Sequence, residues 1–273
     1  MPASRLVPSH WGDDMPSRRN PTLHHTIAVS HKNLATADMS QKTTTIVIRP
    51  LRPSTDIGAI TKIYADAVIR TTATYEIDPP SEGEMRRRLV DSVQTTGFPC
   101  FVAEEEEEEE ETTSSSSSSP PASTTNQQQQ QQQPSILGYA YITPYRPRPA
   151  YRYTVEHSVY VAPGARRRGV GRRLMTAIIR ECEKMGFRQI IAVIGEGGSG
   201  GEGDLIENSN ASVRFHRELG FRISGTLQGS GYKFGRWLDT TLMQLSINGG
   251  SHAPVDPESV PEITFHRGNS AAT

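Results

Sequence analysis

Apolar residues along the middle of the chain switch between two spacings, and each spacing predicts one kind of element. Short β-branched or aromatic runs predict strands, and apolar residues three or four positions apart predict amphipathic helices. The predicted strands are Thr45–Leu51, Pro99–Ala103, Ile136–Tyr145, Tyr151–Val161, Arg188–Ile194, Phe221–Leu227 and Leu238–Ile247. The predicted helices are Ile57–Arg70, one from Ser81 past Val93, Gly169–Met185, and one from Ser209 or Asn210 to Leu219. This order predicts an α/β fold, a mixed β-sheet flanked by helices with one central β-α-β unit.

Local signals mark several element ends. Asp56 stands at a cap-like position before the first helix, and Ser81 with Glu84 forms a capping box for the second. Gly186 is a C-cap for the third. The run Arg188–Ile194 is continuously apolar after its first two residues, as expected of a central strand.

Three segments are too polar to bury a core. Residues 1–44 and 249–273 lack apolar periodicity, and residues 104–134 contain eight glutamates, a serine run and seven glutamines. Such tracts do not bury enough apolar surface to offset the entropy of ordering, so all three are predicted to be disordered. The insert lies between two strands expected to pair as a hairpin, where a longer loop adds little to the entropy lost on closing it. Residues 45–248 therefore form the predicted domain.

Composition narrows the function classes. The net charge is -1, but without the eight-glutamate run 29 basic residues face 22 acidic ones, a net of +7. This mild excess suits an anionic cofactor, whereas the long basic patches typical of nucleic-acid binding are missing. Two cysteines indicate neither a disulfide scaffold nor a metal site and favour a reducing, cytoplasmic compartment. No apolar run is long enough for a membrane span.

The strongest chemical signal follows the strand that ends at Val161. A loop with Arg166, Arg167 and Arg168 leads into Gly169-Val170-Gly171, which opens a helix. Backbone N–H groups at a helix N-terminus bind anions, and glycines allow a phosphate to approach closely. The spacing is neither a dinucleotide fingerprint nor a P-loop. It predicts a pyrophosphate cradle, although a solvated basic turn has the same composition.

The segment Arg166–Gly171 resembles the Arg/Gln-x-x-Gly-x-Gly acetyl-coenzyme A motif of the GNAT N-acetyltransferases. Further motifs resemble the phosphinothricin and methionine sulfoximine acetyltransferases of that family, and they extend the resemblance from Ile46 to about Ile247. They are I-R-P-L-R at Ile48, T-T-A-T-Y-E at Thr71, P-P-S-x-x-E-M at Pro79, G-Y-A-Y at Gly138, P-Y-R-P-R-x-A-Y at Pro144, T-V-E-H-S-V-Y-V at Thr154, A-V-I-G at Ala192, S-V-R-F-H-x-E-L-G-F at Ser212 and K-F-G-R-W-L-D at Lys233.

The resemblance implies a role for individual residues. Glu156 matches the catalytic glutamate, and His216 matches a position near the thioester. The implied acceptor pocket contains Arg146, Pro147, Arg148, His157 and Ser158. The implied acetyl-CoA site contains Val159, Tyr160, Val161, Arg166, Arg167, Arg168, Gly169, Val170, Gly171 and Arg172. Where the family has a cofactor-contacting asparagine this chain has Ser209, so Asn208 or Asn210 is expected to take that role.

The chemistry of these residue types agrees with the resemblance. A protonated amine must lose a proton before it attacks a thioester, and the Glu156 carboxylate can accept that proton directly or through one water. Arg146 or Arg148 can pair with the carboxylate of an amino acid in bidentate fashion. Plainer interpretations remain open: Glu156 as an ion-pair partner, His216 as a hydrogen-bonded core histidine, and both arginines as surface residues.

The sequence thus predicts an enzyme that transfers the acetyl group of acetyl-CoA to a small amino acid-like amine, without a metal. The resemblance also implies a homodimer and the herbicide resistance associated with such enzymes. The alternatives are acetylation of a different amine or a protein N-terminus, and a catalytically degenerate acyl-CoA-binding scaffold.

Overall fold

The computed structural model describes residues 44–107, 135–195 and 205–254, and within these ranges it leaves out the side chains of Glu107 and residues 205–210. Nearly all of the predicted N-terminal extension, most of the glutamate–serine–glutamine insert and most of the C-terminal tail lie outside the described residues, and so does most of the glycine-rich stretch after Gly195. The predictions made for those segments are therefore not addressed by the structure.

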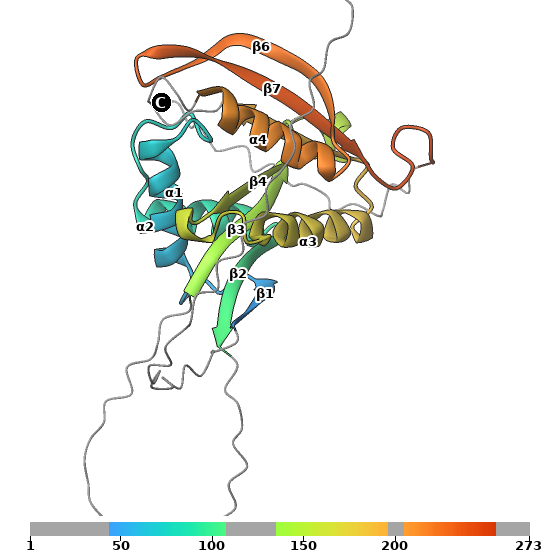
Figure 1. Ribbon diagram of the computed structural model, residues 1–273. Helices are drawn as coiled ribbons and strands as arrows, with labels where there is room; N and C mark the ends of the chain where they lie inside the picture. The colour runs from blue at the N-terminus through green and yellow to red at the C-terminus, as the bar shows by residue number, and fades with distance from the viewer. Residues whose placement is uncertain (1–43, 108–134, 196–204, 255–273) are drawn as a thin grey trace, which may run out of the picture. The chain divides into compact units, whose positions relative to one another are not determined.

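Within the described ranges, seven strands form one mixed sheet (Figure 1) in the order β1-β2-β3-β4-β5-β7-β6. Neighbouring strands pair antiparallel except β4 and β5, which are parallel and are joined through helix α3. The strands are β1 (Thr44–Pro50), β2 (Cys100–Glu107), β3 (Ser135–Pro144), β4 (Thr154–Val161), β5 (Gln189–Gly195), β6 (Arg222–Lys233) and β7 (Arg236–Ser246). This arrangement confirms the predicted mixed sheet with a central β-α-β unit.

Helices cover both faces of the sheet. They are α1 (Ile57–Arg70), α2 (Glu82–Arg86) continuing into the π-helix η1 (Arg87–Gln94), α3 (Val170–Lys184) and α4 (Leu205–Glu218), with short 3₁₀ turns η2 (Pro149–Tyr151) and η3 (Pro163–Ala165). Tyr64 of α1 meets Tyr160 edge-on, with ring centroids 4.9 Å apart. The residue that follows Tyr160 on β4, Val161, pairs with Gly138 of β3. A Cβ atom at Gly138 would point toward Leu174 of α3, 3.3 Å from its Cδ1 atom. Because successive strand residues point to opposite faces, α1 and α3 lie on opposite sides.

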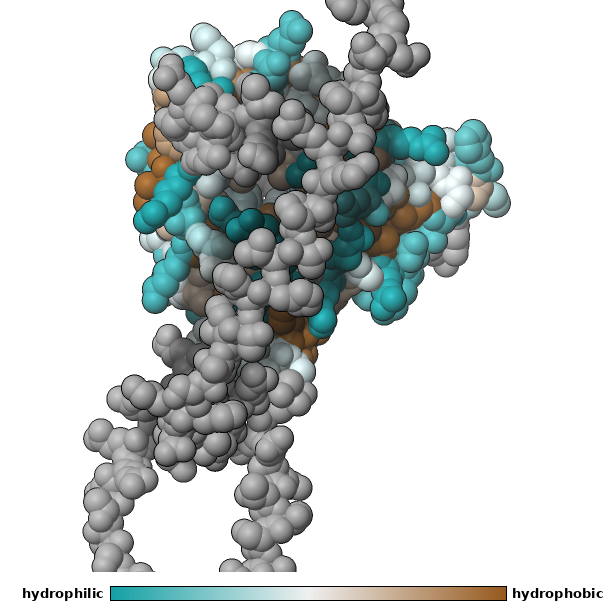
Figure 2. All heavy atoms as spheres, viewed as in Figure 1, coloured by the Kyte–Doolittle hydropathy of each residue, from teal (hydrophilic) through white to brown (hydrophobic). Residues whose placement is uncertain are grey.

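The core lies between the sheet and these helices. Fully buried side chains include Ile60 of α1, Leu89 of η1, Ile142 of β3 and Ile178 of α3. In the face seen in Figure 2, hydrophilic residues predominate and apolar ones gather in patches. The described fold thus buries the apolar stripe that the helical spacing predicted.

Several boundaries differ from the prediction for physical reasons. Asp56 precedes α1, but its carboxylate binds the buried Arg49 guanidinium instead of capping the helix. The predicted disordered insert began at Glu104, yet Glu104 and Glu105 continue β2 and form ion pairs with Arg49 and Arg168. The predicted tail from Gly249 on likewise begins with a described turn, in which the Gly250 N–H bonds the Ile247 carbonyl.

Three further elements have different lengths from those predicted. Tyr151 belongs to η2 instead of β4, because its N–H bonds the Arg148 carbonyl in a tight turn. Helix α4 begins at Leu205, ahead of the expected cap. Strand β6 continues to Lys233 instead of ending at Leu227, because a bulge absorbs the glycine-containing stretch after Leu227.

Candidate active site

Strands β4 and β5 separate midway along their length. They pair over three positions, with Glu156 opposite Ile191 as the last pair. Beyond Glu156, β4 remains paired with β3 as far as Val161, and β5 remains paired with β7 as far as Gly195. Among the described residues, the backbone groups of His157 to Val161 that point toward β5 therefore have no strand partner. They are open hydrogen-bonding groups beside a carboxylate.

The alternation along β4 sorts the predicted site residues into two groups. Glu156, Ser158 and Tyr160 lie opposite Thr143, Tyr141 and Tyr139 of β3, on the face covered by α1. The intervening residues His157, Val159 and Val161 point to the other face, which α3 and α4 cover. The structure therefore brings Ser158 to the same side of the sheet as Glu156 but does not bring His157 there.

The Glu156 side chain is half-buried at the end of the paired region. Burial raises the pKa of its carboxyl above the ordinary 4.5, and the nearby positive charge of Arg146 lowers it by less. No ion pair with Glu156 is formed within the described residues, so its role as a structural ion-pair partner gains no support. A carboxylate with a raised pKa is a stronger proton acceptor than an exposed one.

His157 and His216 form a buried pair. Their Nε2 atoms are 3.1 Å apart, and His216 Nδ1 lies 2.7 Å from the Ser212 carbonyl oxygen. Since a carbonyl only accepts, neutral His216 donates from Nδ1 and accepts at Nε2, so His157 donates from Nε2. The remaining nitrogen, His157 Nδ1, is buried without a partner in the described structure. Both nitrogens of His216 are thus engaged.

Burial governs the protonation of this pair. It lowers the pKa of His157 to about 3, with a further contribution from His216. Burial also lowers the pKa of His216, although the bond to the Ser212 carbonyl opposes this shift. Both rings are therefore neutral at pH 7, which agrees with the hydrogen-bond pattern of two neutral imidazoles.

The loop between β4 and α3 leaves a series of N–H groups without partners. Arg167 and Gly169 have positive φ angles of 62° and 80°, which turn the chain into the helix. The first helical bond runs from the Arg173 N–H to the Gly169 carbonyl. Across the described residues, no acceptor is bonded to the N–H groups of residues 167–169, and those of residues 170–172 belong to the first turn, which has no intrahelical acceptors. The predicted anion cradle has this geometry.

Most arginine side chains of this loop are held by acids. Arg168 pairs with Glu105 of β2, and Arg172 pairs with Glu218 of α4. Arg166 lies 3.9 Å from an oxygen of Asp66. These pairs link the loop and the first turn of α3 to three neighbouring elements. The two asparagines expected to contact the cofactor, Asn208 and Asn210, lie in α4, but their side chains are outside the described residues.

The predicted carboxylate-binding residues lie between β3 and β4. The Arg146 guanidinium carbon lies over the Tyr145 ring, 4.4 Å from its centroid, and its charge acts on Glu156. Pro147 and Arg148 are exposed in the same loop. Arg146 is therefore nearer to the candidate base, whereas Arg148 has no side-chain partner among the described residues.

Tyr75 and Lys233, for which the sequence patterns predicted no role, fasten the loop between α1 and α2, on the face of the sheet that carries Glu156. The Tyr75 hydroxyl donates to the Asp239 carbonyl at 2.8 Å. The Lys233 ammonium, which is buried, donates to the carbonyls of Thr71 and Thr74 at 2.9 and 2.8 Å. Together they fasten the α1–α2 loop to β6 and β7. Lysine burial in a strand gives no local sequence signal, because its partners are more than 150 residues away.

Two further properties concern the described residues alone. In these ranges, no three histidine, cysteine or acidic side chains converge as metal ligands. The helices described here include none that is both long and apolar enough to cross a bilayer.

Comparisons with known proteins agree with this geometry. Residues 90–221 match the model of the acetyltransferase (GNAT) family. A phosphinothricin N-acetyltransferase from Alcaligenes faecalis is 40% identical over 195 residues, which cover 71% of this chain and 80% of that protein. The chain belongs to the GNAT acetyltransferase family.

Other relatives support this membership. A methionine sulfoximine/methionine sulfone acetyltransferase from Pseudomonas paraeruginosa is 34% identical over 199 residues, covering 73% of this chain and 94% of that protein. A crystal structure of a phosphinothricin acetyltransferase from Sinorhizobium meliloti in complex with acetyl-CoA matches with a TM-score of 0.60 and 33% identity, covering 78% of this chain and 95% of that one.

The GNAT chain is therefore an acetyl-CoA-dependent N-acetyltransferase, with acetyl-CoA as its co-substrate. Its described residues fit that co-substrate in two places. The unpaired N–H groups of the β4–α3 loop suit a pyrophosphate, and the open edge of β4 beyond Glu156 suits the amide groups of an extended arm.

Proposed function

We propose that this acetyltransferase acts on the α-amino group of a small amino acid-like acceptor, of the phosphinothricin or methionine sulfoximine type, with Glu156 as the general base. The position of Glu156 carries the proposal. It is half-buried, has no ion-pair partner among the described residues, and is the last residue before β4 leaves β5. Relatives with both substrate names are similar to this chain.

Glu156 accepts the proton that the acceptor's ammonium must lose, directly or through one water. Acetyl-CoA supplies the acetyl group as an activated thioester. Backbone N–H groups of Val159 to Val161 that point toward β5 are available to stabilise negative charge on the acetyl oxygen. No covalent bond to the enzyme is needed, so transfer is direct within a ternary complex.

The co-substrate is held by β4 and the loop after it. Val159, Tyr160 and Val161 supply the strand edge, and the backbone of residues 166–172 supplies the anion cradle. Asn208 or Asn210 completes the site from α4. The ion pairs of Arg166, Arg168 and Arg172 with neighbouring elements support a positioning role for these side chains.

The acceptor's carboxylate is bound by Arg146, with Pro147 and Arg148 shaping the same loop and Ser158 lining the Glu156 face. The influence of the Arg146 charge on Glu156 supports this assignment, because the amine and carboxylate of an amino acid are attached to one carbon. His157 and His216 support the site from behind the sheet. The full engagement of both His216 nitrogens favours the alternative interpretation of this residue as a hydrogen-bonded core histidine.

We further propose that the enzyme is a cytoplasmic homodimer. Large apolar side chains are exposed along β6 and β7, with Trp237 at 68% and Tyr232 at 56% of full exposure. Monomers rarely expose contiguous apolar patches larger than a few hundred Å², so the exposed apolar side chains of this hairpin suit a subunit contact. Cys100 and Cys182 are both buried and free, as expected in a reducing compartment.

A panel of amines tests the function. Purified enzyme is incubated with acetyl-CoA and phosphinothricin, methionine sulfoximine, methionine sulfone, other amino acids or a peptide with a free N-terminus. Thiol release and the mass of the acetylated product are then measured. The proposal predicts turnover on the amino acid analogues. Turnover on the peptide alone would assign the enzyme to protein N-termini, and CoA binding without any turnover would indicate a scaffold.

A further inference from the structure

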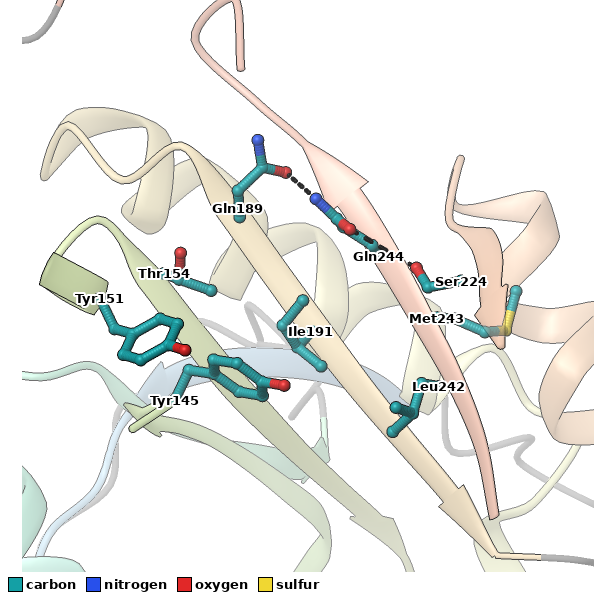
Figure 3. A pocket seen from close by; sticks show the side chains of 9 residues that line it. All are labelled: Tyr145, Tyr151, Thr154, Gln189, Ile191, Ser224, Leu242, Met243 and Gln244. Carbon is teal, nitrogen blue, oxygen red and sulfur yellow. Dashed lines mark hydrogen bonds between the residues drawn. The ribbon is translucent and has the colours of Figure 1, made fainter. Parts of the chain in front are cut away.

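A pocket of about 240 Å³ opens on the Glu156 face at the start of β4 and β5 (Figure 3). Two tyrosine rings form one side, and the polar ends of residues from β5, β6 and β7 lie across from them. The lining residues are Tyr145, Tyr151, Thr154, Gln189, Ile191, Ser224, Leu242, Met243 and Gln244. The volume equals that of about eight water molecules at about 30 Å³ each, which is enough for an amino acid side chain.

The pocket adjoins both residues proposed to bind the acceptor's backbone. Ile191 pairs directly with Glu156, and Thr154 precedes Glu156 by two residues on the same face, about 7 Å along the strand. On the other side, the Tyr145 ring carries the Arg146 guanidinium. The amine, carboxylate and side chain of an amino acid are attached to one carbon. Glu156, Arg146 and the pocket lie next to one another in a matching arrangement, one for each of these three groups.

The pocket offers uncharged hydrogen-bonding groups. Gln244 Nε2 donates to Gln189 Oε1 at 2.7 Å, and the Ser246 hydroxyl donates to the same oxygen at 2.9 Å. Both lone pairs of that oxygen are used, which leaves the Gln189 NH₂ group and the second Gln244 N–H without partners among the described residues. The Tyr145 and Thr154 hydroxyls are likewise without described partners. The available groups are therefore mainly donors.

The charge of the lining decides which side chain fits. None of the lining residues is a lysine, arginine, aspartate or glutamate. An anionic group placed here would lose hydration without gaining a cation of its own, which is costly, because Arg146 on the Tyr145 ring is assigned to the acceptor's carboxylate. A neutral group rich in oxygen acceptors would instead meet several free donors at once.

We infer that this pocket binds the acceptor's side chain and selects an uncharged oxygen-bearing group, such as a sulfone or sulfoximine, over an anionic phosphinate. The inference rests on the proposed function, since it takes Glu156 as the site of the amine. Similarity alone does not make this choice, because relatives named for either class of substrate are similar to the chain.

The test compares kcat/KM for methionine sulfone and phosphinothricin. The wild type is expected to prefer methionine sulfone. Gln244→Lys places a cation in the pocket and should shift the ratio toward phosphinothricin by about tenfold or more. Tyr145→Phe keeps the ring but removes one donor, and should lower kcat/KM for methionine sulfone about tenfold. Gln94→Leu is the control, because this amide bonds the Leu51 carbonyl outside the pocket.

Binding is measured separately by calorimetry, with methionine sulfone titrated into the full-length enzyme in the presence of CoA. Weaker binding to Tyr145→Phe than to the wild type or Gln94→Leu supports the subsite. An unchanged ratio of kcat/KM values in both pocket variants overturns it, even if amino acids are acetylated. A change in oligomeric state with an unchanged ratio also overturns it, since the pocket would then be a subunit contact. Failure of the wild type to acetylate any amino acid would reject the proposed function instead.

Discussion

The Tyr75 ring lies so close to Gly231 that a methyl group there would have no room. A Cβ atom at Gly231 would be 2.4 Å from Tyr75 Cε2 and 2.6 Å from Cδ2, where carbon atoms normally stay about 3.5–4.0 Å apart. The ring cannot move freely, because its hydroxyl is bonded to the Asp239 carbonyl and lies 3.0 Å from the Thr240 hydroxyl. Gly225, on the same strand, has nothing within 4 Å of its own Cβ position.

Comparing alanine substitutions at Gly231 and Gly225 separates the effect of the Tyr75 contact from the general effect of replacing a glycine. Replacing either by alanine reduces the entropy of the unfolded chain, which stabilises by about 0.4–1 kcal/mol. Gly231→Ala additionally overpacks a partly buried contact, at a cost of about 1–3 kcal/mol. The Gly231 variant should therefore be less stable than the Gly225 variant by about 1–3 kcal/mol. At about 2–4 °C per kcal/mol for a domain of this size, this is a Tm difference of about 2–12 °C.

Thermal and urea unfolding of both variants measure this difference, and the same pair of substitutions in a Tyr75→Ala background completes the cycle. The penalty should disappear in that background, because the ring is gone. Gly231→Ala should also raise the KM for the acceptor, since the displaced loop covers the Glu156 face. Equal stability of the two alanine variants in the wild-type background would refute the close packing of Tyr75 on β6.

Three other changes test separate parts of the structure. Asp56→Asn removes one of the two carboxylates that pair with buried Arg49, while Glu104 remains, and should cost about 1–3 kcal/mol in urea unfolding, whereas Asp66→Asn, which breaks a more exposed pair with Arg70, should cost at most about 1 kcal/mol. Because the folded pKa of His157 is about 3 and its ordinary value is 6.5, the unfolded chain binds more protons between these values, and stability should fall as the pH drops through that window. His157→Phe should flatten this part of the Tm–pH curve, and an unchanged curve would contradict the buried neutral ring. Trp237→Ser should weaken dimerisation in analytical ultracentrifugation without unfolding the protein, and a wild-type association constant would place the subunit contact elsewhere.

Local patterns predicted much of the fold. The Ser81 hydroxyl accepts from the Glu84 N–H, which is one of the two capping-box bonds, while the Glu84 carboxylate binds Arg87 and Arg88 instead of the Ser81 N–H. The spacing of Val170, Leu174 and Ile178 placed α3 within one residue at each end. These features depend on residues within one or two turns of each other. The parallel pairing of β4 and β5 also followed from the strand–helix–strand order.

Features set by distant residues could not be predicted in the same way. Asp56 stands where a helix cap is expected in the sequence, but its carboxylate accepts hydrogen bonds from the buried Arg49 guanidinium of β1 instead of from the helix N-terminus. The strand β6 contains glycines that indicate a turn, and only pairing with β7 makes the extended form favourable. The pocket near Glu156 combines two tyrosines from the segment between β3 and β4 with residues of β4, β5, β6 and β7, so no short motif indicates it.

The alternation of side chains along a strand was enough to predict part of the site. Glu156 and His157 are adjacent in a strand, so their side chains must point to opposite faces. Treating them as one pocket followed the family resemblance instead of the strand geometry. The polar residues Gln189 and Gln244 gave a weaker signal: Gln189 opens an otherwise apolar strand, Gln244 stands between Met243 and Leu245, and both lie on the face that Glu156 shares.

The pH dependence of kcat/KM in wild-type enzyme and Glu156→Gln tests the role of Glu156 most directly. If Glu156 is the base, the wild type loses activity in acid as a group with a pKa above 4.5 becomes protonated. Glu156→Gln should then lose about 10²–10⁴-fold in rate together with that acid limb, while Glu181→Gln, which removes the partner of Lys184 on the surface of α3, keeps both. A Glu156→Gln enzyme with the wild-type rate and the same acid limb would contradict general-base catalysis by Glu156.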